Sequence, residues 1–345
     1  MSKAQTSVPH CAGALLFDAD VRILRDRVVL RLSESDDACC LLEYRLMRGD
    51  GTTLIQVLHL TDVATLQEFI AGDPYGDHLR VQYQSIGRAY QERSNKGAMP
   101  RRTRPEERDP LREIGLIRSC TNEAELMRIA SCVLSRLGGR SYTYRWLQVD
   151  DKTDLVAVQR CLVGCNPGWF HAYFKYQWYR NDPFVEYARR NGAPSPSGEI
   201  VALGKDHWAR NVAGRFGLRS SVICPAHAPA SSLFGLLQVG NELTATVGEA
   251  ALWQHRVLFR ALAEEMLDWG VARQRSDELS RVDLDQRELA ALRLLRAGRT
   301  AVHVAESLGV SERTAYGIFR KINDKLGVSH IARAVQAATE RGLIE

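Results

Sequence analysis

Residues 298–327 read GRTAVHVAESLGVSERTAYGIFRKINDKLG, and this stretch contains the clearest helix signals in the chain. Gly309 and Val310 form a tight turn between two short segments, and Ser311 is placed to cap the second segment. Gly327 is placed to end that segment. The stretch therefore predicts two helices joined by a tight turn. The second helix has one narrow apolar stripe, made of Ala315, Ile318, Phe319, Ile322 and Leu326.

Flanking residues extend this pattern to four helices. Asp285 is placed to cap a helix that ends at Gly298, and Ser329 to cap another that ends at Gly342. A tight turn followed by a helix with a basic outer face is the helix-turn-helix pattern, in which the second helix enters the major groove of DNA. The alternative is an ordinary helical domain with a solvated charged face. The residues expected to contact base edges or phosphates are Arg313, Thr314, Tyr316, Gly317, Arg320 and Lys321.

The composition is that of a globular protein with more than one domain. The chain has 345 residues, of which 45% are hydrophobic and 25% charged. Its net charge of +5, from 46 basic and 41 acidic residues, is too small to indicate nucleic-acid binding by itself. No apolar run approaches the roughly 18 residues of a membrane span, and the N-terminus lacks the order of a secretory signal. The eight scattered cysteines are typical of reduced thiols, so we expect a cytoplasmic protein without a membrane partner.

Two polar stretches divide the chain. Residues 94–110 are rich in proline and charge, and residues 270–283 contain few apolar side chains. The prediction is an α+β domain of unknown role at 1–95, a linker at 96–110, a central domain at 111–270, a second linker at 271–283 and the four-helix domain at 284–345. In the first block the sequence favours strands over 27–32, 41–47 and 53–60, followed by a short helix capped by Thr61.

The central block alternates helices and strands. A capping pair at Asn122 and Glu125 precedes a helix that ends at Gly138. Strands are predicted over 142–149, 156–163, 220–226 and 233–239, and a long final helix over 247–269. Strands in meander order with helices at both ends favour an α–β–α sandwich around an antiparallel sheet.

The C-terminal motifs resemble the DNA-binding domain of the LuxR family. The matching residues are Leu284-x-x-Arg287-Glu288, Gly298-Arg299-Thr300, Val304-Ala305, Leu308-Gly309-Val310-Ser311-x-x-Thr314 and Lys325-Leu326-Gly327-Val328. The resemblance implies a dimer that binds an operator in double-stranded DNA. It also implies a dimer seam on the fourth helix, at Ile331, Val335 and Ala338. His303 and Ile318 depart from the residues usual in the family.

Residues 169–183, WFHAYFKYQWYRNDP, resemble the acyl-homoserine-lactone-binding domain of quorum-sensing LuxR regulators. Residues 217–225, which include Ser221 where the family has glycine, resemble a later strand of that domain. The resemblance implies a ligand site at Trp169, Tyr173, Asp182 and Ser221, in which Asp182 accepts the ligand's amide N–H and the two aromatic side chains donate to its carbonyls. The residues alone also allow an aromatic core in which Asp182 caps the helix starting at Pro183. Ser197 and Cys165 stand where the family commonly has aromatic residues.

These features favour a transcription regulator that responds to an acyl-homoserine lactone or a related signal. The alternative is a ligand-independent regulator whose central domain binds other proteins. A third possibility makes residues 1–95 a second small-molecule sensor or a self-association domain. We predict no enzyme, cofactor or metal site: Cys161 and Cys165 lack a second pair, and Cys224 and His227 would lie on opposite faces of a strand.

Overall fold

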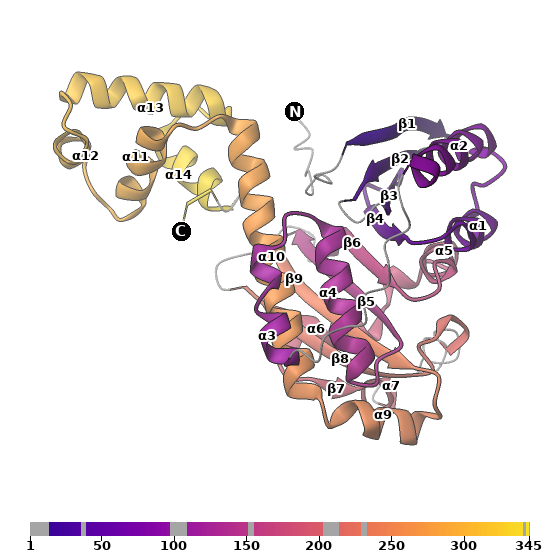
Figure 1. The fold of residues 1–345 in the computed structure, drawn as a ribbon. Coiled ribbons are helices and arrows are strands. Elements are labelled where there is room, and N and C mark those ends of the chain that lie inside the picture. The colour runs from indigo at the N-terminus through magenta and orange to yellow at the C-terminus, as the bar shows by residue number, and fades with distance from the viewer. Residues whose placement is uncertain are drawn as a thin grey trace. The chain divides into compact units, whose positions relative to one another are not determined.

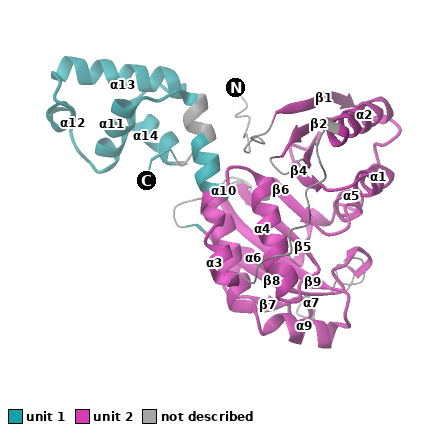
Figure 2. Ribbon diagram, viewed as in Figure 1, with its two compact units in different colours: residues 1–10, 228–232, 270–345 teal, residues 11–227, 233–269 magenta. Residues whose placement is uncertain are grey.

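The computed structural model describes residues 14–35, 39–96, 109–150, 155–202, 214–228, 233–340 and 343–344. The chain divides into two compact units (Figure 2). The larger unit comprises residues 11–227 and 233–269, and the smaller comprises residues 1–10, 228–232 and 270–345.

One nine-stranded sheet forms the centre of the larger unit, in the order β1-β2-β3-β4-β6-β5-β9-β8-β7 (Figure 1). Neighbouring strands are antiparallel except β4 and β6, which are parallel. The α+β class is confirmed, and the described strands of the central block pair antiparallel as predicted. The parallel pair, which joins this block to the first one, was not predicted. The strands are β1 (Leu15–Ile23), β2 (Asp26–Glu34), β3 (Cys40–Met47), β4 (Thr53–Leu60), β5 (Ser141–Asp150), β6 (Leu155–Gly164), β7 (Ser195–Pro196), β8 (Ser220–His227) and β9 (Leu233–Asn241).

The first four strands form a meander that the sequence predicts except for β1. The turn between β3 and β4 contains Gly51 at a φ of 92°, a conformation that glycine adopts without steric cost. Strand β1 carries Asp18, Asp20 and Arg22 along the edge of the sheet, and this charge hides its strand character. Two helices follow the meander, α1 (Val63–Gly72) and α2 (Arg80–Lys96). Asp62, rather than the predicted Thr61, caps α1 by accepting from the backbone N–H of Thr65.

Helices cover both faces of the central sheet. Tyr144 and Trp146 of β5 point to one face, where they donate hydrogen bonds to the backbone carbonyls of Ala263 and Met266 on α10. Arg145 and Leu147 alternate with them and point to the opposite face, where α5 and α6 lie. The helices of this part are α3 (Pro110–Ile114), α4 (Glu123–Arg136), α5 (Gly168–Lys175), α6 (Pro183–Arg190), α7 (Ser197–Ala202), α9 (Ala245–Trp253) and α10 (Arg256–Val282).

A buried ionic cluster joins the meander to the central strands. The Arg160 guanidinium on β6 bonds Glu43 of β3 at 2.8 Å and Glu123 of α4 at 2.5 Å. Arg45 of β3 also bonds Glu43, at 3.0 Å. Burial acts to raise the pKa of Glu43, but Arg160 and Arg45 outweigh it, so that this pKa lies below its usual value. The first block therefore shares one sheet and one charge network with the central block, and the boundary drawn between them stays a prediction.

The helices around the second predicted linker differ from expectation. The single helix predicted over 247–269 is divided into α9 and α10, and α10 continues to Val282 through the segment predicted as a linker. That segment contains three arginines together with Ala272, Gln274, Glu278 and Leu279, which all favour helix, and its only glycine is Gly270. Asp283, at a φ of 52°, lies in the left-handed region just after the helix. Most of the first predicted linker, 97–108, lies outside the described residues.

After the end of α10, the described part of the smaller unit forms four helices, α11 (Gln286–Arg296), α12 (Ala301–Leu308), α13 (Glu312–Leu326) and α14 (Ile331–Glu340). Asp285 and Glu288 form a capping box, and Thr300 and Ser311 cap the next two helices. Gly309 and Gly327 end α12 and α13 at positive φ. The helices enclose a common core of Leu289, Ala291, Leu292, Val304, Ala305, Ala315, Phe319, Ile322, Leu326, Ala334, Ala338, Leu343 and Ile344.

Candidate functional site

Three of the four residues that the sequence predicts as the ligand site lie together in the structure. Trp169 and Tyr173 are one helical turn apart on α5, and their rings stack with centroids 4.8 Å apart. Asp182 lies just before α6, whose first residue is Pro183. The Tyr173 hydroxyl donates a 2.8 Å hydrogen bond to the Asp182 carboxylate, and all three side chains are buried.

Asp182 also caps α6, as the alternative interpretation predicts. Its Oδ1 accepts from the backbone N–H groups of Phe184 at 2.8 Å and Val185 at 3.4 Å. The two predicted roles thus concern different oxygens of one carboxylate, because Oδ1 holds the helix and Oδ2 faces Tyr173.

Arg145 completes this cluster, and the sequence analysis did not identify it. Its fully buried guanidinium donates from Nη1 to Asp182 at 2.5 Å and to the Tyr173 hydroxyl at 3.1 Å. It also lies 5.7 Å from the ring centroid of Trp169 and 5.5 Å from that of Tyr173. The feature that could have indicated Arg145 is an arginine in the middle of a predicted strand whose two faces were both expected to be covered by helices.

The charges of this cluster are held in place by its geometry. Burial acts to lower the pKa of Arg145, but Asp182 and Tyr173 outweigh burial and raise it above its usual value. Burial and the nearby Asp182 raise the pKa of Tyr173 well above its usual value. The tyrosine therefore remains a protonated donor, and the arginine remains a cation.

More buried polar side chains lie on the same face of the sheet. The strand register places Thr143, Gln56 and Gln159 on the face that carries Arg145. Among the residues that the structure describes, no partner is found for Thr143 Oγ1, Gln56 Oε1 or Gln159 Nε2. Most buried polar atoms in proteins are hydrogen-bonded, so these atoms call for a partner such as an ordered water or a bound polar molecule.

The fourth predicted ligand residue, Ser221, is on β8 and lies on this same face. It is buried, and its hydroxyl accepts from Gln238 Nε2 at 3.2 Å. Ser197, which stands at a position where an aromatic wall is common, is also buried, and its hydroxyl donates to Glu249 at 2.8 Å.

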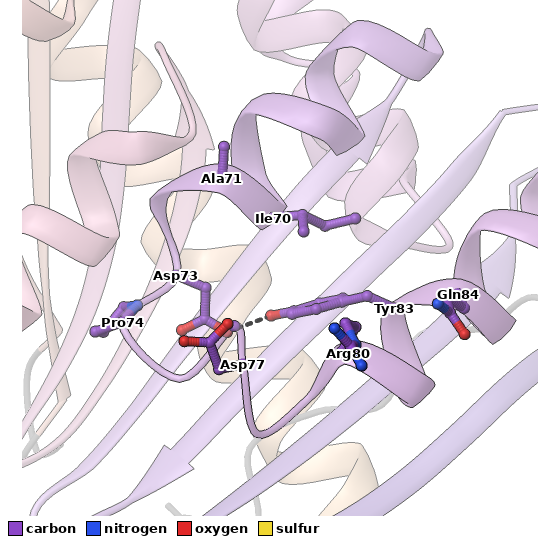
Figure 3. A pocket seen from close by; sticks show the side chains of 9 residues that line it. Ile70, Ala71, Asp73, Pro74, Asp77, Arg80, Tyr83 and Gln84 are labelled. Carbon is purple, nitrogen blue, oxygen red and sulfur yellow. Dashed lines mark hydrogen bonds between the residues drawn. The ribbon is translucent and has the colours of Figure 1, made fainter.

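A second cluster lies under α1, where a hollow of about 550 Å³ opens between α1 and α2 (Figure 3). Its lining includes Asp73, which accepts hydrogen bonds from the hydroxyls of Tyr83 and Tyr44. His171 of α5 is buried with its Nδ1 3.9 Å from Asp73. Burial lowers the pKa of His171 to about 4, against the opposing effect of Asp73. The imidazole is therefore neutral at pH 7.

The space between a sheet and its covering helices is one of the places where proteins bind small molecules. Residues 122–268 match the sequence model of a family described as the autoinducer binding domain. This region therefore belongs to that family, and the recognition made from the sequence is confirmed for the central domain.

The chain is weakly similar to several solved structures. The crystal structure of Escherichia coli SdiA, at 15% identity and a TM-score of 0.47, covers 68% of this chain and 98% of its own. SdiA in complex with octanoyl-rac-glycerol matches at 13% identity and 0.44, with coverages of 68% and 96%. The N-acylhomoserine lactone dependent LuxR family transcription factor CepR2 from Burkholderia cenocepacia matches at 15% identity and 0.39, with coverages of 48% and 95%. No curated protein sequence matches the chain.

In the smaller unit, all six residues predicted to contact DNA lie on the exposed side of α13: Arg313, Thr314, Tyr316, Gly317, Arg320 and Lys321. A side-chain carbon added at Gly317 would meet no atom within 4 Å, so packing inside the domain does not require glycine there. Lys325, further along the helix, instead bonds Glu288 at 2.8 Å. The seam expected on α14 is wrong in one respect, because Ala338 is fully buried in the domain's own core and Ile331 and Val335 pack against it.

No helix in the described part of the chain combines the length and the apolar character needed to cross a membrane.

Proposed function

We propose that the chain is a transcription regulator of quorum-sensing type, which binds an acyl-homoserine lactone or a related small signal and acts as a homodimer on a DNA operator. The observation that carries this proposal is the buried polar cluster around Asp182 inside a region that matches the autoinducer binding domain. Polar side chains on the same face that have no partner among the described residues, such as Thr143, support a polar ligand at that position.

Ligand binding would stabilise the central domain by filling this site. A ligand that binds only the folded state adds RT ln(1 + [L]/Kd), which is about 2.7 kcal/mol at a hundred times its Kd. Filling an unsatisfied polar site would also restore hydrogen bonds that burial has removed from Thr143 and Gln159. We therefore expect a stabilised domain to favour the DNA-binding dimer.

The proposed DNA contact is the exposed face of α13. Arg320 and Lys321 would bind phosphates, while Arg313 and Tyr316, near the start of the helix, would reach base edges. The apolar stripe of the helix is buried in the four-helix core, which leaves the basic side available for the groove.

Two measurements on the full-length protein test this proposal. The first is the melting temperature with a panel of lactones of increasing acyl length, and a rise with at least one of them is expected. The second is selection from random duplex DNA, followed by the salt dependence of binding for Arg320→Ala. Loss of one phosphate contact should reduce the slope of log K against log salt by about one. Unchanged binding by Arg320→Ala would contradict the assigned orientation of α13.

A second candidate function is a ligand-independent regulator whose central domain binds other proteins. It is favoured by the ion pair of Arg145 with Asp182, which satisfies the carboxylate without any ligand. The bond of Ser197 to Glu249 likewise replaces an aromatic wall with an internal contact. Full DNA affinity of ligand-free protein, together with no melting shift for any lactone, would select this function.

A further inference from the structure

The Asp182 carboxylate has no acceptor position left for a ligand. Two carboxylate oxygens provide about four lone-pair positions. Oδ1 accepts from the backbone N–H groups of Phe184 and Val185, and Oδ2 accepts from Arg145 at 2.5 Å and Tyr173 at 2.8 Å. An amide N–H of a ligand could reach Asp182 only by displacing one of these donors.

Arg145, in contrast, keeps one edge of its guanidinium unpaired. Nη1 makes both of its hydrogen bonds, whereas Nε and Nη2 have no partner in the described part of the chain although both are buried. Nε and Nη2 form the edge that donates two parallel hydrogen bonds to a pair of acceptor oxygens. The site thus offers donors where the family resemblance implied an acceptor.

The surroundings of this edge suit a molecule with a polar end and an apolar remainder. Arg145 lies on the sheet face between two buried apolar clusters, because its register neighbour Cys161 belongs to one cluster and the next inward residue on β5, Leu147, belongs to the other. Gln159 Nε2 is a further donor on this face for which the described residues offer no partner. The apolar side chains next to Leu147 are Phe184, Val185, Ala188, Ile200, Ile223, Phe234 and Leu236.

The charge balance favours a neutral polar end. Asp182 already neutralises Arg145, so a ligand carboxylate would leave one uncompensated negative charge in a buried site. Carbonyl oxygens of an ester, lactone or ketone would satisfy the same donors without that cost.

We propose that this domain binds a neutral amphipathic signal through carbonyl oxygens held by the Nε–Nη2 edge of Arg145, and that the signal donates no N–H to Asp182. The proposal rests on the proposed function, since it assumes that the central domain binds a signal. It makes Arg145, rather than Asp182, the residue that selects the polar end of the ligand.

The decisive experiment compares ligands that differ only in the N–H. N-acyl homoserine lactones with butanoyl, octanoyl and dodecanoyl chains are compared with their ester analogues, the α-acyloxy-γ-butyrolactones. The free carboxylic acids of the same three chains are the third set of ligands. Affinities are measured by calorimetry on the full-length chain. The association constant of each ester should be at least about one third of that of the matching amide, because no hydrogen bond is lost. Weaker ester binding than this would overturn the inference while leaving the proposed function intact.

The other outcomes are also decisive. Tighter binding of a free acid than of its ester would assign the edge to a carboxylate and overturn the neutral class. Binding of none of the probes would count against the proposed function itself, and the inference would fall with it.

A variant tests the role of Arg145 directly. Arg145→Met frees Asp182 Oδ2 to accept a ligand N–H, so the amide should now bind about tenfold or more tightly than its ester, the value of one hydrogen bond to a charged group. Arg160→Met is the matched control, because Arg160 is an equally buried, carboxylate-paired arginine on the other face of the sheet. An unchanged amide-to-ester ratio in Arg145→Met would contradict the inference. If neither variant folds, the comparison of ligands on the unmodified chain still decides.

Discussion

The two faces of the central sheet each bury an arginine, and the two arginines are used differently. Arg160 of β6 lies between Glu43 and Glu123, which come from β3 and α4 and tie three elements together. Among the described residues, Arg145 of β5 has one carboxylate partner, Asp182, and an edge without a partner. A buried charge surrounded by opposite charges serves the fold, whereas a buried charge with free donors can still bind a further polar group.

The largest effect is expected from Arg160→Met. Removing this guanidinium leaves Glu43 and Glu123 buried without their shared cation, which should lower the free energy of unfolding by about 3–5 kcal/mol. Urea unfolding of the full-length protein measures this change. A loss below about 1 kcal/mol would mean that the pair of carboxylates adapts by taking up protons, and the contrast between the two faces would not hold.

The next effect is a pH dependence that arises on the Arg145 side of the sheet, at His171. The unfolded chain protonates this histidine near its ordinary pKa of about 6.5, whereas the folded chain does so only at about 4. Between these values the unfolded state binds more protons, so stability falls as the pH falls, by up to about 3 kcal/mol over the whole window.

His171→Phe should remove most of this dependence, because phenylalanine keeps the ring contacts with Tyr44 and Phe69 and has no titrating nitrogen. The measurement is the difference in unfolding free energy between pH 7 and pH 5 for the two proteins. The same drop in both would place the cause at another group.

A smaller effect separates two buried tyrosines on opposite faces. Tyr173→Phe loses a hydrogen bond to the charged Asp182, and Tyr144→Phe loses one to the backbone carbonyl of Ala263. Losses of about 1.5–3 and about 1 kcal/mol are expected from the charged and neutral acceptors respectively.

Only Tyr173→Phe should also change the melting shift that a ligand produces, since Tyr144 faces α10. Differential scanning fluorimetry with and without ligand compares the pair. Equal changes in both variants would show that the shift reports general stability and not the site.

The smallest effect is expected on the exposed surface of α13, where packing does not restrict the choice of side chain. Gly317→Ala on α13 should raise the stability of the smaller unit by up to about 1 kcal/mol, because alanine favours helix and meets no neighbouring atom. If the backbone at Gly317 approaches DNA, the same change should weaken binding to a selected operator. Higher stability together with unchanged binding would mean that glycine is merely tolerated there.

The features that could be predicted from the sequence are those set by neighbouring residues. Ser311, Gly309 and Gly327 determine the ends of α12 and α13 through local caps and turns. The grouping of Trp169 with Tyr173 follows from their spacing on one helix, and Asp182 follows from its place before Pro183.

The features that could not be predicted depend on pairing between distant segments. Asp182 and Arg145 are 37 positions apart, and nothing local indicates that they meet. The parallel pairing of β4 with β6 likewise brings residues 53–57 to residues 158–162. Strand β1 and the continuation of α10 to Val282 were missed because their charged side chains hide a regular backbone.

The parallel junction of β4 with β6 has a consequence for anyone who trims the protein. A fragment that starts near residue 110 would lack β4. Strand β6 would then be an exposed edge strand whose backbone groups can pair with other chains. The fragment would also leave Arg160 without its partner Glu43. Such a fragment should aggregate, so the N-terminal third of the chain protects and stabilises the central block.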